Sequence, residues 1–118
     1  MVDREVRLRV GPLKLDGQVP FRPSYSFDLP QRGGVYLIYD LRGCLYIGRT
    51  DDLYDRFDTH HDYSHNPQLR YALRHPVGVI DFAWILVEGI EQMDLERRLI
   101  RDLEPLCNDI RYTTCKET

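Results

Sequence analysis

The order of hydrophobic and polar positions along the chain predicts a series of short strands and helices. Over residues 6–10, apolar residues alternate with arginines, which is typical of a half-buried strand. After a Gly-Pro break, residues 13–15 can return as the second arm of a hairpin. Residues 18–33 hold three prolines and little periodicity, so we expect an extended segment there.

Two further segments, 35–39 and 44–47, are rich in β-branched and aromatic residues. The sequence between them, Asp40-Leu41-Arg42-Gly43, has turn chemistry, so the two segments predict a β-hairpin. Residues 79–87 are apolar with few breaks, which predicts a strand buried on both faces.

Capping residues and prolines mark three helices. The first starts near Asp52, where Thr50 or Asp51 can cap it. The second starts at the Asn-Pro pair 66–67, and the third spans residues 91–103. The predicted order is β-β-α-α-β-α, an α+β fold in which helices pack on a small sheet, preceded by an extended or hairpin arm.

Length and cysteine content narrow the class of protein. The 118 residues suit one compact domain. No stretch approaches the ~20 apolar residues of a membrane span, and no apolar run follows the first residues as in a secretory signal. Cys44, Cys107 and Cys115 form neither a disulfide framework nor a zinc knuckle, which favours a reducing compartment. We therefore expect a cytoplasmic protein without a membrane partner.

The net charge of −3 is unusual for a nucleic-acid protein, because affinity for the phosphate backbone is mainly electrostatic. The basic residues are fourteen arginines and two lysines, and the planar guanidinium suits phosphate. Codon bias in a GC-rich genome explains the arginine excess equally well.

Two tyrosines beside glycines are candidate functional residues. Tyr36 and Tyr46 lie on the neighbouring strands of the predicted hairpin. They share a face of the sheet if the residue numbers of each pair of opposite residues add up to an even number. Gly34 and Gly48 beside them would let a ligand approach the backbone. Tyrosine is also an ordinary strand residue, and the chain has eight.

Arg56 and His60 are four residues apart on the first helix and share a face with Leu53 and Phe57. An arginine on a partly inward face needs an anion, either a core carboxylate or a substrate phosphate. A half-buried structural imidazole is the alternative for His60. His61 and His65 are four residues apart, a spacing that two zinc ligands on a helix can have. A zinc site is therefore a further alternative.

Glu96 lies on the apolar stripe of the third helix, and no basic residue faces it within that helix. A carboxylate in this position should be paired, protonated or bound to metal. If Glu96 has only a structural role, we expect it to form an ion pair with Arg56 of the first helix.

In this order, the residues resemble the motifs of the GIY-YIG nuclease family. Gly34-Val35-Tyr36 corresponds to the first motif, with valine for isoleucine, and Tyr46-Ile47-Gly48 to the second. Five further positions match the helix arginine, the histidine or tyrosine after it, the polar residue after the second motif, the metal-binding glutamate and the terminal asparagine: Arg56, His60, Arg49, Glu96 and Asn108.

The resemblance implies a small three-stranded antiparallel sheet flanked by helices over residues 29–109, with an arm at 1–28 and a tail at 110–118. It also implies hydrolysis of DNA phosphodiester bonds with one divalent metal, Mg²⁺ or Mn²⁺. The implied catalytic residues are Tyr36, Tyr46, Arg56, His60 and Glu96, and the implied substrate-binding residues are Gly34, Gly48, Arg49 and Asn108.

A mechanism follows as a hypothesis. Glu96 would hold the metal, since a lone carboxylate suits an ion that keeps most of its waters. Tyr36 would be the general base, provided that Arg56 or the metal lowers its pKa from near 10. Tyr46 and His60 would position the water, and Asn108 would hold the geometry. The alternatives are a catalytically silent nucleic-acid-binding or scaffold module and a zinc-dependent hydrolase. Sequence specificity would come from dimerisation, a partner protein or the arm.

Overall fold

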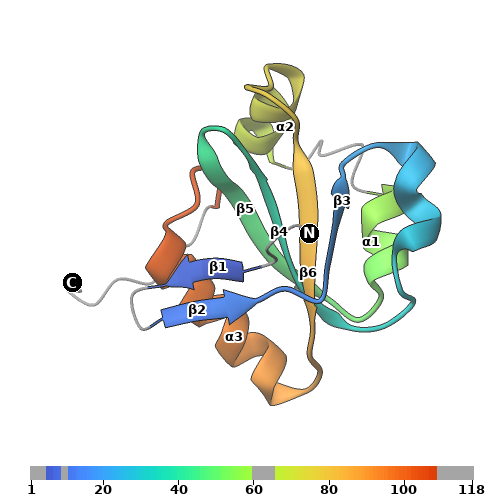
Figure 1. The fold of residues 1–118 in the computed structure, drawn as a ribbon, viewed down its shortest axis with the longest axis vertical. Coiled ribbons are helices and arrows are strands. Elements are labelled where there is room, and N and C mark those ends of the chain that lie inside the picture. Colours follow the sequence, from blue (N-terminus) through green and yellow to red (C-terminus); the bar gives the residue numbers. More distant parts are fainter. Residues whose placement is uncertain (1–4, 9–10, 60–65, 109–118) are drawn as a thin grey trace.

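The computed structural model describes residues 5–8, 11–59 and 66–108. At the N-terminus, β1 (Glu5–Leu8) and β2 (Gly11–Lys14) pair antiparallel as a separate two-stranded sheet. The predicted N-terminal hairpin is therefore present (Figure 1), but Gly11 and Pro12, which were expected to break the chain between its arms, instead begin β2 and pair with Leu8 and Arg7.

The main sheet holds four antiparallel strands in the order β3-β6-β4-β5. They are β3 (Gly17–Pro20), β4 (Gly34–Asp40), β5 (Gly43–Thr50) and β6 (Asp81–Leu86). The predicted α+β class and the β4–β5 hairpin are confirmed, but the expected number of three strands was wrong.

The fourth strand, β3, begins at Gly17 and continues into the segment that was expected to be extended, residues 18–33. In β3, Gly17 pairs with Trp84 of β6, and the indole ring lies where a Cβ at position 17 would be. A glycine therefore lets the large ring of the neighbouring strand pack flat against the backbone. After β3, a 3₁₀ helix η1 (Pro23–Asp28) occupies the middle of the segment that was predicted to be extended.

Three α-helices complete the fold: α1 (Leu53–Thr59), α2 (Pro67–Arg74) and α3 (Ile90–Leu103). The N-cap of α1 is Asp52, whose Oδ1 accepts the N–H of Asp55 at 3.0 Å, and not the predicted Thr50 or Asp51. Asn66 caps α2 as predicted, by accepting the N–H of Leu69 at 3.0 Å. All three predicted helices are therefore present.

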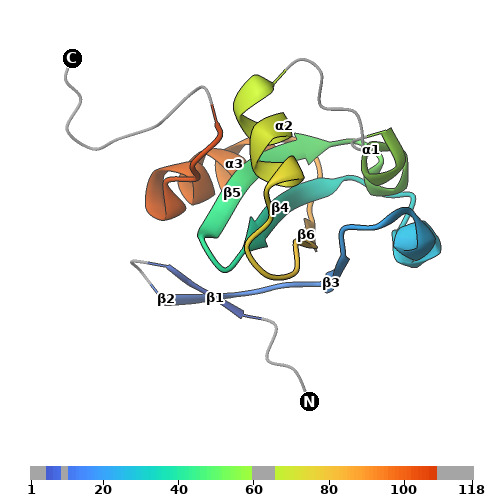
Figure 2. The same cartoon turned by 90° about the horizontal axis from the view of Figure 1, so that it is seen from above.

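The sheet lies between two helical layers, as Figure 2 shows. On one face, η1, α1 and α2 enclose a core that includes Tyr36, Phe57 and Phe82. On the other face, α3 packs Leu95 and Leu99 against the sheet. Because β4 and β6 are central, their side chains enter both cores, as predicted for β6.

The edge strand β5 is covered by the segment that follows α3. The N–H of Leu106 donates to Cys44 O at 3.1 Å, and the N–H of Cys107 donates to Leu45 O at 2.8 Å. This part of the edge is therefore not available for pairing with another chain. Within the described ranges, no helix is long and apolar enough to cross a membrane.

Candidate active site

The register of the β4–β5 hairpin places the two candidate tyrosines on one face. Tyr36 pairs with Gly48 and Ile38 pairs with Tyr46, so paired numbers sum to an even number as the prediction required. The ring centroids of Tyr36 and Tyr46 are 6.2 Å apart. Tyr36 is only 2% exposed and stacks on Phe82 at 5.1 Å with an interplanar angle of 11°.

The glycines of the two motifs make this packing possible. A Cβ at Gly48 would collide with the Tyr36 phenol, which lies over the glycine of the paired strand. A Cβ at Gly34 would lie 2.5 Å from Ile85 O and 3.0 Å from Leu53 Cδ1. Both glycines thus have a packing reason that the sequence did not suggest, and their contact with substrate remains a prediction.

The charge state of Tyr36 differs from the expected one. Burial and then the neighbouring Tyr46 raise the pKa of Tyr36 well above its ordinary value, while Arg56 opposes them and Glu96 adds to them. Arg56 acts in the predicted direction, but burial outweighs it because a phenolate loses its hydration in the core. The same influences show that Tyr46, Arg56 and Glu96 all lie within electrostatic reach of the Tyr36 phenol.

Glu96 is paired, but not with the arginine that the sequence suggested. Arg49 Nε lies 3.3 Å from Glu96 Oε1, and the Glu96 side chain is 22% exposed. Arg49 follows Ile47 by two positions in β5 and therefore points to the α3 side of the sheet, whereas Arg56 lies on α1 across the sheet. Burial raises the pKa of Glu96, and Arg49 and then Arg97 oppose this shift.

Arg56 is half-buried between the core residues of α1, as its helical position predicted. Among residues 5–8, 11–59 and 66–108, its guanidinium forms no ion pair. A half-buried cation without a carboxylate partner is suited to bind an anion.

The histidines cannot be placed in this site. His60, His61 and His65 lie outside the described residues, so the predicted role of His60 and the zinc alternative both remain untested. Within the described part of the chain, no group of three His, Cys, Asp or Glu side chains could hold a metal ion.

Asn108 fastens the segment after α3 to the edge strand. Its Oδ1 accepts the N–H of Ile47 at 2.9 Å, and its Nδ2 donates to Ile47 O at 2.8 Å. Asn66 Nδ2 also donates to Cys107 O at 3.0 Å. The Asn108 amide therefore behaves like one more residue paired with β5, next to Tyr46 and Gly48.

Gln92 shapes the site but was not among the predicted site residues. It is 3% exposed, and its Nε2 donates to Thr50 O and to Val87 O, both at 3.0 Å. It joins the end of β5 to α3, one helical turn before Glu96. A polar residue on the apolar stripe was the signal that could have identified it.

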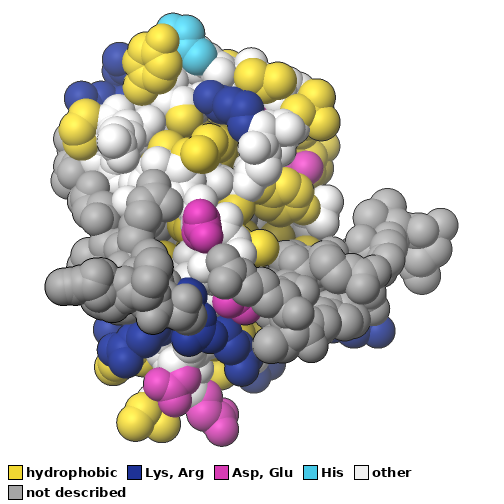
Figure 3. Space-filling view, turned by 90° about the vertical axis from the view of Figure 1, so that its left-hand side faces the viewer, with side chains coloured by type: hydrophobic (Ala, Val, Ile, Leu, Met, Phe, Trp, Pro, Cys, Tyr) yellow, Lys and Arg dark blue, Asp and Glu magenta, His cyan; other side chains and the backbone are white. Residues whose placement is uncertain are grey.

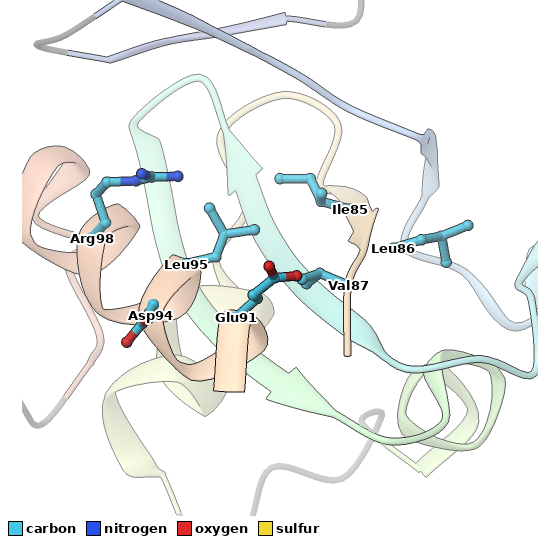
Figure 4. A pocket seen from close by; sticks show the side chains of 7 residues that line it. All are labelled: Ile85, Leu86, Val87, Glu91, Asp94, Leu95 and Arg98. Atoms are coloured by element: carbon cyan, nitrogen blue, oxygen red, sulfur yellow. The ribbon is translucent and has the colours of Figure 1, made fainter. Parts of the chain in front are cut away.

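A recess beside α3 does not coincide with this site. The cavity has a volume of about 390 Å³, and its lining, shown in Figure 4, contains none of the predicted site residues. It is lined by Ile85, Leu86, Val87, Glu91, Asp94, Leu95 and Arg98. The predicted site residues within the described ranges lie instead on β4, β5, α1 and α3, with Asn108 in the segment after α3.

Comparison with known proteins agrees with the motif positions. The model of the GIY-YIG catalytic domain matches residues 32–110. No curated protein and no solved structure matches the chain significantly. The match covers most of the chain and includes β4, β5 and all three α-helices, so the chain belongs to the GIY-YIG family of nuclease domains.

Proposed function

We propose that the protein is an endonuclease that hydrolyses DNA phosphodiester bonds with a single divalent metal ion. The family is one of nucleases that act on DNA and generally depend on a divalent metal. The observation that carries the proposal is that the charges of Arg56 on α1 and Glu96 on α3 both act on the Tyr36 phenol of β4.

The residues present fit an ion that needs few protein ligands. Glu96 offers one partly buried carboxylate whose raised pKa reflects poor hydration, and in this structure the cation beside it is Arg49. Mg²⁺ and Mn²⁺ accept one carboxylate, waters and phosphate oxygens as ligands. When bound, such an ion would stabilise negative charge on the phosphate and on the leaving 3′ oxygen.

The side chains of the chain would do the remaining work. Arg56 would neutralise charge that develops on the phosphate, and Arg49, once released from Glu96, would contact the backbone of the DNA. Figure 3 shows Lys and Arg side chains gathered in the lower half of one face, at the level of α3, where a phosphate backbone could lie. Gly34 and Gly48 keep the backbone of the motifs close to the substrate.

The attacking water would be oriented by Tyr36 and Tyr46. Its oxygen bonds to phosphorus as the bond to the 3′ oxygen breaks, and its proton must pass to a base. Burial keeps Tyr36 protonated at neutral pH, Tyr46 adds to this, and the charge of Glu96 is a smaller influence in the same direction. Neutralising the Glu96 charge would remove only that smaller influence, and the charge of Arg56 would favour the phenolate. His60 would relay the proton, and Asn108 would hold β5 in place.

Nicking of supercoiled plasmid tests the proposal. We expect the wild type to nick the plasmid with Mg²⁺ and not with EDTA. Glu96→Gln should not nick under either condition, although its circular dichroism spectrum should match that of the wild type. Glu91→Gln, an exposed glutamate on the same helix, is the matched control and should nick normally. Equal nicking by Glu96→Gln would remove the metal assignment, and DNA binding without any nicking by the wild type would favour the silent module.

A further inference from the structure

Residues 66–80 have a charge that differs from that of the rest of the chain. They hold two arginines and one histidine but no aspartate or glutamate, in a protein whose net charge is −3. This stretch is α2 and the loop leading to β6. Figure 3 shows hydrophobic, histidine and basic side chains next to one another at the top of the molecule, the end where α2 lies in Figure 1.

An exposed aromatic pair lies at the centre of this surface. The rings of Tyr71 and His75 stack with centroids 4.1 Å apart and an interplanar angle of 27°. His75 Nδ1 lies 2.9 Å from Tyr71 O, and because a carbonyl only accepts, the Nδ1–H donates. Tyr71 is nevertheless 65% exposed. The imidazole thus fixes the phenol ring while most of its surface faces solvent.

The helix itself directs this pair away from the core. Leu69 and Ala72 are buried beneath α2, so Tyr71 and the exposed Arg74 lie on its outer side. Arg74 is one turn after Arg70 and next to His75. Exposed rings with adjacent guanidinium groups are what proteins use to bind unpaired nucleotides, because every base has a face that stacks and every nucleotide carries a phosphate.

The end of α2 is fastened to the β4–β5 turn. Arg42 Nη2 donates to Asp40 Oδ2 at 2.7 Å and to Ala72 O at 3.0 Å. The same Asp40 oxygen accepts the N–H of Val77 at 3.0 Å. The surface is therefore held in one arrangement before any ligand binds, which lowers the entropic cost of binding.

The surface also borders the edge strand of the active site. Figures 1 and 2 both place α2 beside β5. The capping residue of α2, Asn66, donates to Cys107 O, next to the Asn108 that is bonded to β5. A strand that passes along β5 can continue onto α2.

We propose that Arg70, Tyr71, Arg74 and His75 form a platform that binds unpaired nucleotides next to the cleaved bond. The proposal rests on the proposed function for its choice of DNA as the strand. It implies that DNA with a single-stranded branch or end binds more tightly than blunt duplex of the same length. Tyr71 would stack on a base, and Arg74 would bind a phosphate.

Fluorescence anisotropy in EDTA tests the platform without cleavage, using a labelled 12-nucleotide single strand and a blunt duplex. We expect Tyr71→Ala to weaken single-strand binding about tenfold and to leave duplex binding within about twofold, since one stacked base contributes 1–3 kcal/mol. Tyr71→Phe keeps the ring and should bind as the wild type does. Arg74→Ala should weaken single-strand binding and reduce its dependence on salt.

Phe27 on η1 and Arg22, the residue before η1, are matched controls, because Phe27 is 89% exposed and Arg22 is exposed. Phe27→Ala and Arg22→Ala should leave single-strand binding unchanged. Unchanged binding by Tyr71→Ala, or an equal loss in Tyr71→Ala and Phe27→Ala, would overturn the platform. So would sedimentation showing self-association that Tyr71→Ala removes while strand binding stays intact, because the surface would then bind a second copy.

The result can be separated from that of the nuclease proposal. If the wild type nicks plasmid but Tyr71→Ala binds single strands normally, the platform fails and the nuclease stands. If nothing is nicked but strand binding still depends on Tyr71, the platform stands and the nuclease fails.

Discussion

Arg49 Nε lies 3.3 Å from Glu96 Oε1. Glu96, the residue proposed to hold the metal, is therefore paired with an arginine of β5, the strand that carries the Tyr46-Ile47-Gly48 motif. The Arg49 side chain is 45% exposed, and the pair bridges β5 and α3 at the surface. The guanidinium occupies one carboxylate oxygen that a metal ion would use. Arg49 and the ion therefore compete for Glu96.

Removing this competitor should strengthen metal binding. For Arg49→Gln we expect an up to fivefold higher affinity for Mn²⁺ in the absence of DNA, because an exposed pair contributes at most about 1 kcal/mol. Electron paramagnetic resonance of free Mn²⁺ measures this. Arg98→Gln, on the exposed side of α3, should leave the affinity unchanged. Weaker Mn²⁺ binding by Arg49→Gln would show that Arg49 supports the site instead of competing for it.

Tyr36→Phe separates chemistry from packing. The variant keeps the ring that stacks on Phe82 and loses only the hydroxyl, so the free energy of unfolding and the affinity for DNA should change little. Loss of a group that acts on the attacking water should slow nicking by about 10²-fold or more. Single-turnover nicking with Mg²⁺ is the measurement. Full activity would transfer the role of base to Tyr46 or to a metal-bound hydroxide.

Gly48→Ala should disturb the site through Tyr36. The new methyl group collides with the phenol, and moving the ring out of its packed position should cost about 1–3 kcal/mol of unfolding free energy. Nicking should fall with it. In a double-mutant cycle with Tyr36→Ala, the cost of Gly48→Ala should largely disappear because the ring is absent. Purely additive costs would mean that Gly48 and Tyr36 are not coupled.

Local patterns in the sequence predicted most of the fold. The hairpin, the asparagine cap of α2 and the buried central strand all follow from residues close together in the chain. The fourth strand was missed because β3 pairs with β6, more than sixty positions away in the chain. The need for glycine at position 17 is apparent only once the Trp84 ring packs against it. Propensity carries no information about such a distant partner.

The same limit explains what the sequence missed in the site. The alternation of side chains in the hairpin predicted that Tyr36 and Tyr46 share a face. Helical spacing predicted the buried side of α1. The partner of Glu96 depends on which face of the sheet each arginine occupies, and that is settled only when α3 packs against β5. The charge state of Tyr36 depends on burial by Phe82 and other core residues, which no local pattern reveals.

Stability should fall at alkaline pH because buried acids stay protonated in the fold. Burial raises the pKa of the Cys44 thiol to about 12 and the pKa of the Tyr39 phenol to about 12. The unfolded chain ionises these groups first, so the free energy of unfolding is unaffected below pH ~8 and falls as pH rises toward 12.

Cys44→Ala isolates the contribution of the thiol. Urea unfolding at pH 8 and pH 10 should show a smaller fall in the variant than in the wild type, by about 1 kcal/mol. The variant will be less stable than the wild type at pH 8, because it leaves a cavity, so only the change between the two pH values is compared. Parallel losses in both proteins would show that Cys44 is not responsible.

Asn108→Ala should detach the segment after α3 from the edge strand. Both Ile47 backbone groups lose their partner, which costs about 1–3 kcal/mol. Because Ile47 lies between Tyr46 and Gly48, nicking should slow as well, while Mn²⁺ binding at Glu96 stays unchanged. Asn66→Ser is the matched control: its hydroxyl can still cap α2 but cannot reach Cys107 O, so it should cost about 1–2 kcal/mol and leave nicking intact. If Asn108→Ala loses stability but nicks at the wild-type rate, the asparagine only closes the edge of the sheet. If it nicks slowly without losing stability, its amide acts on the substrate directly.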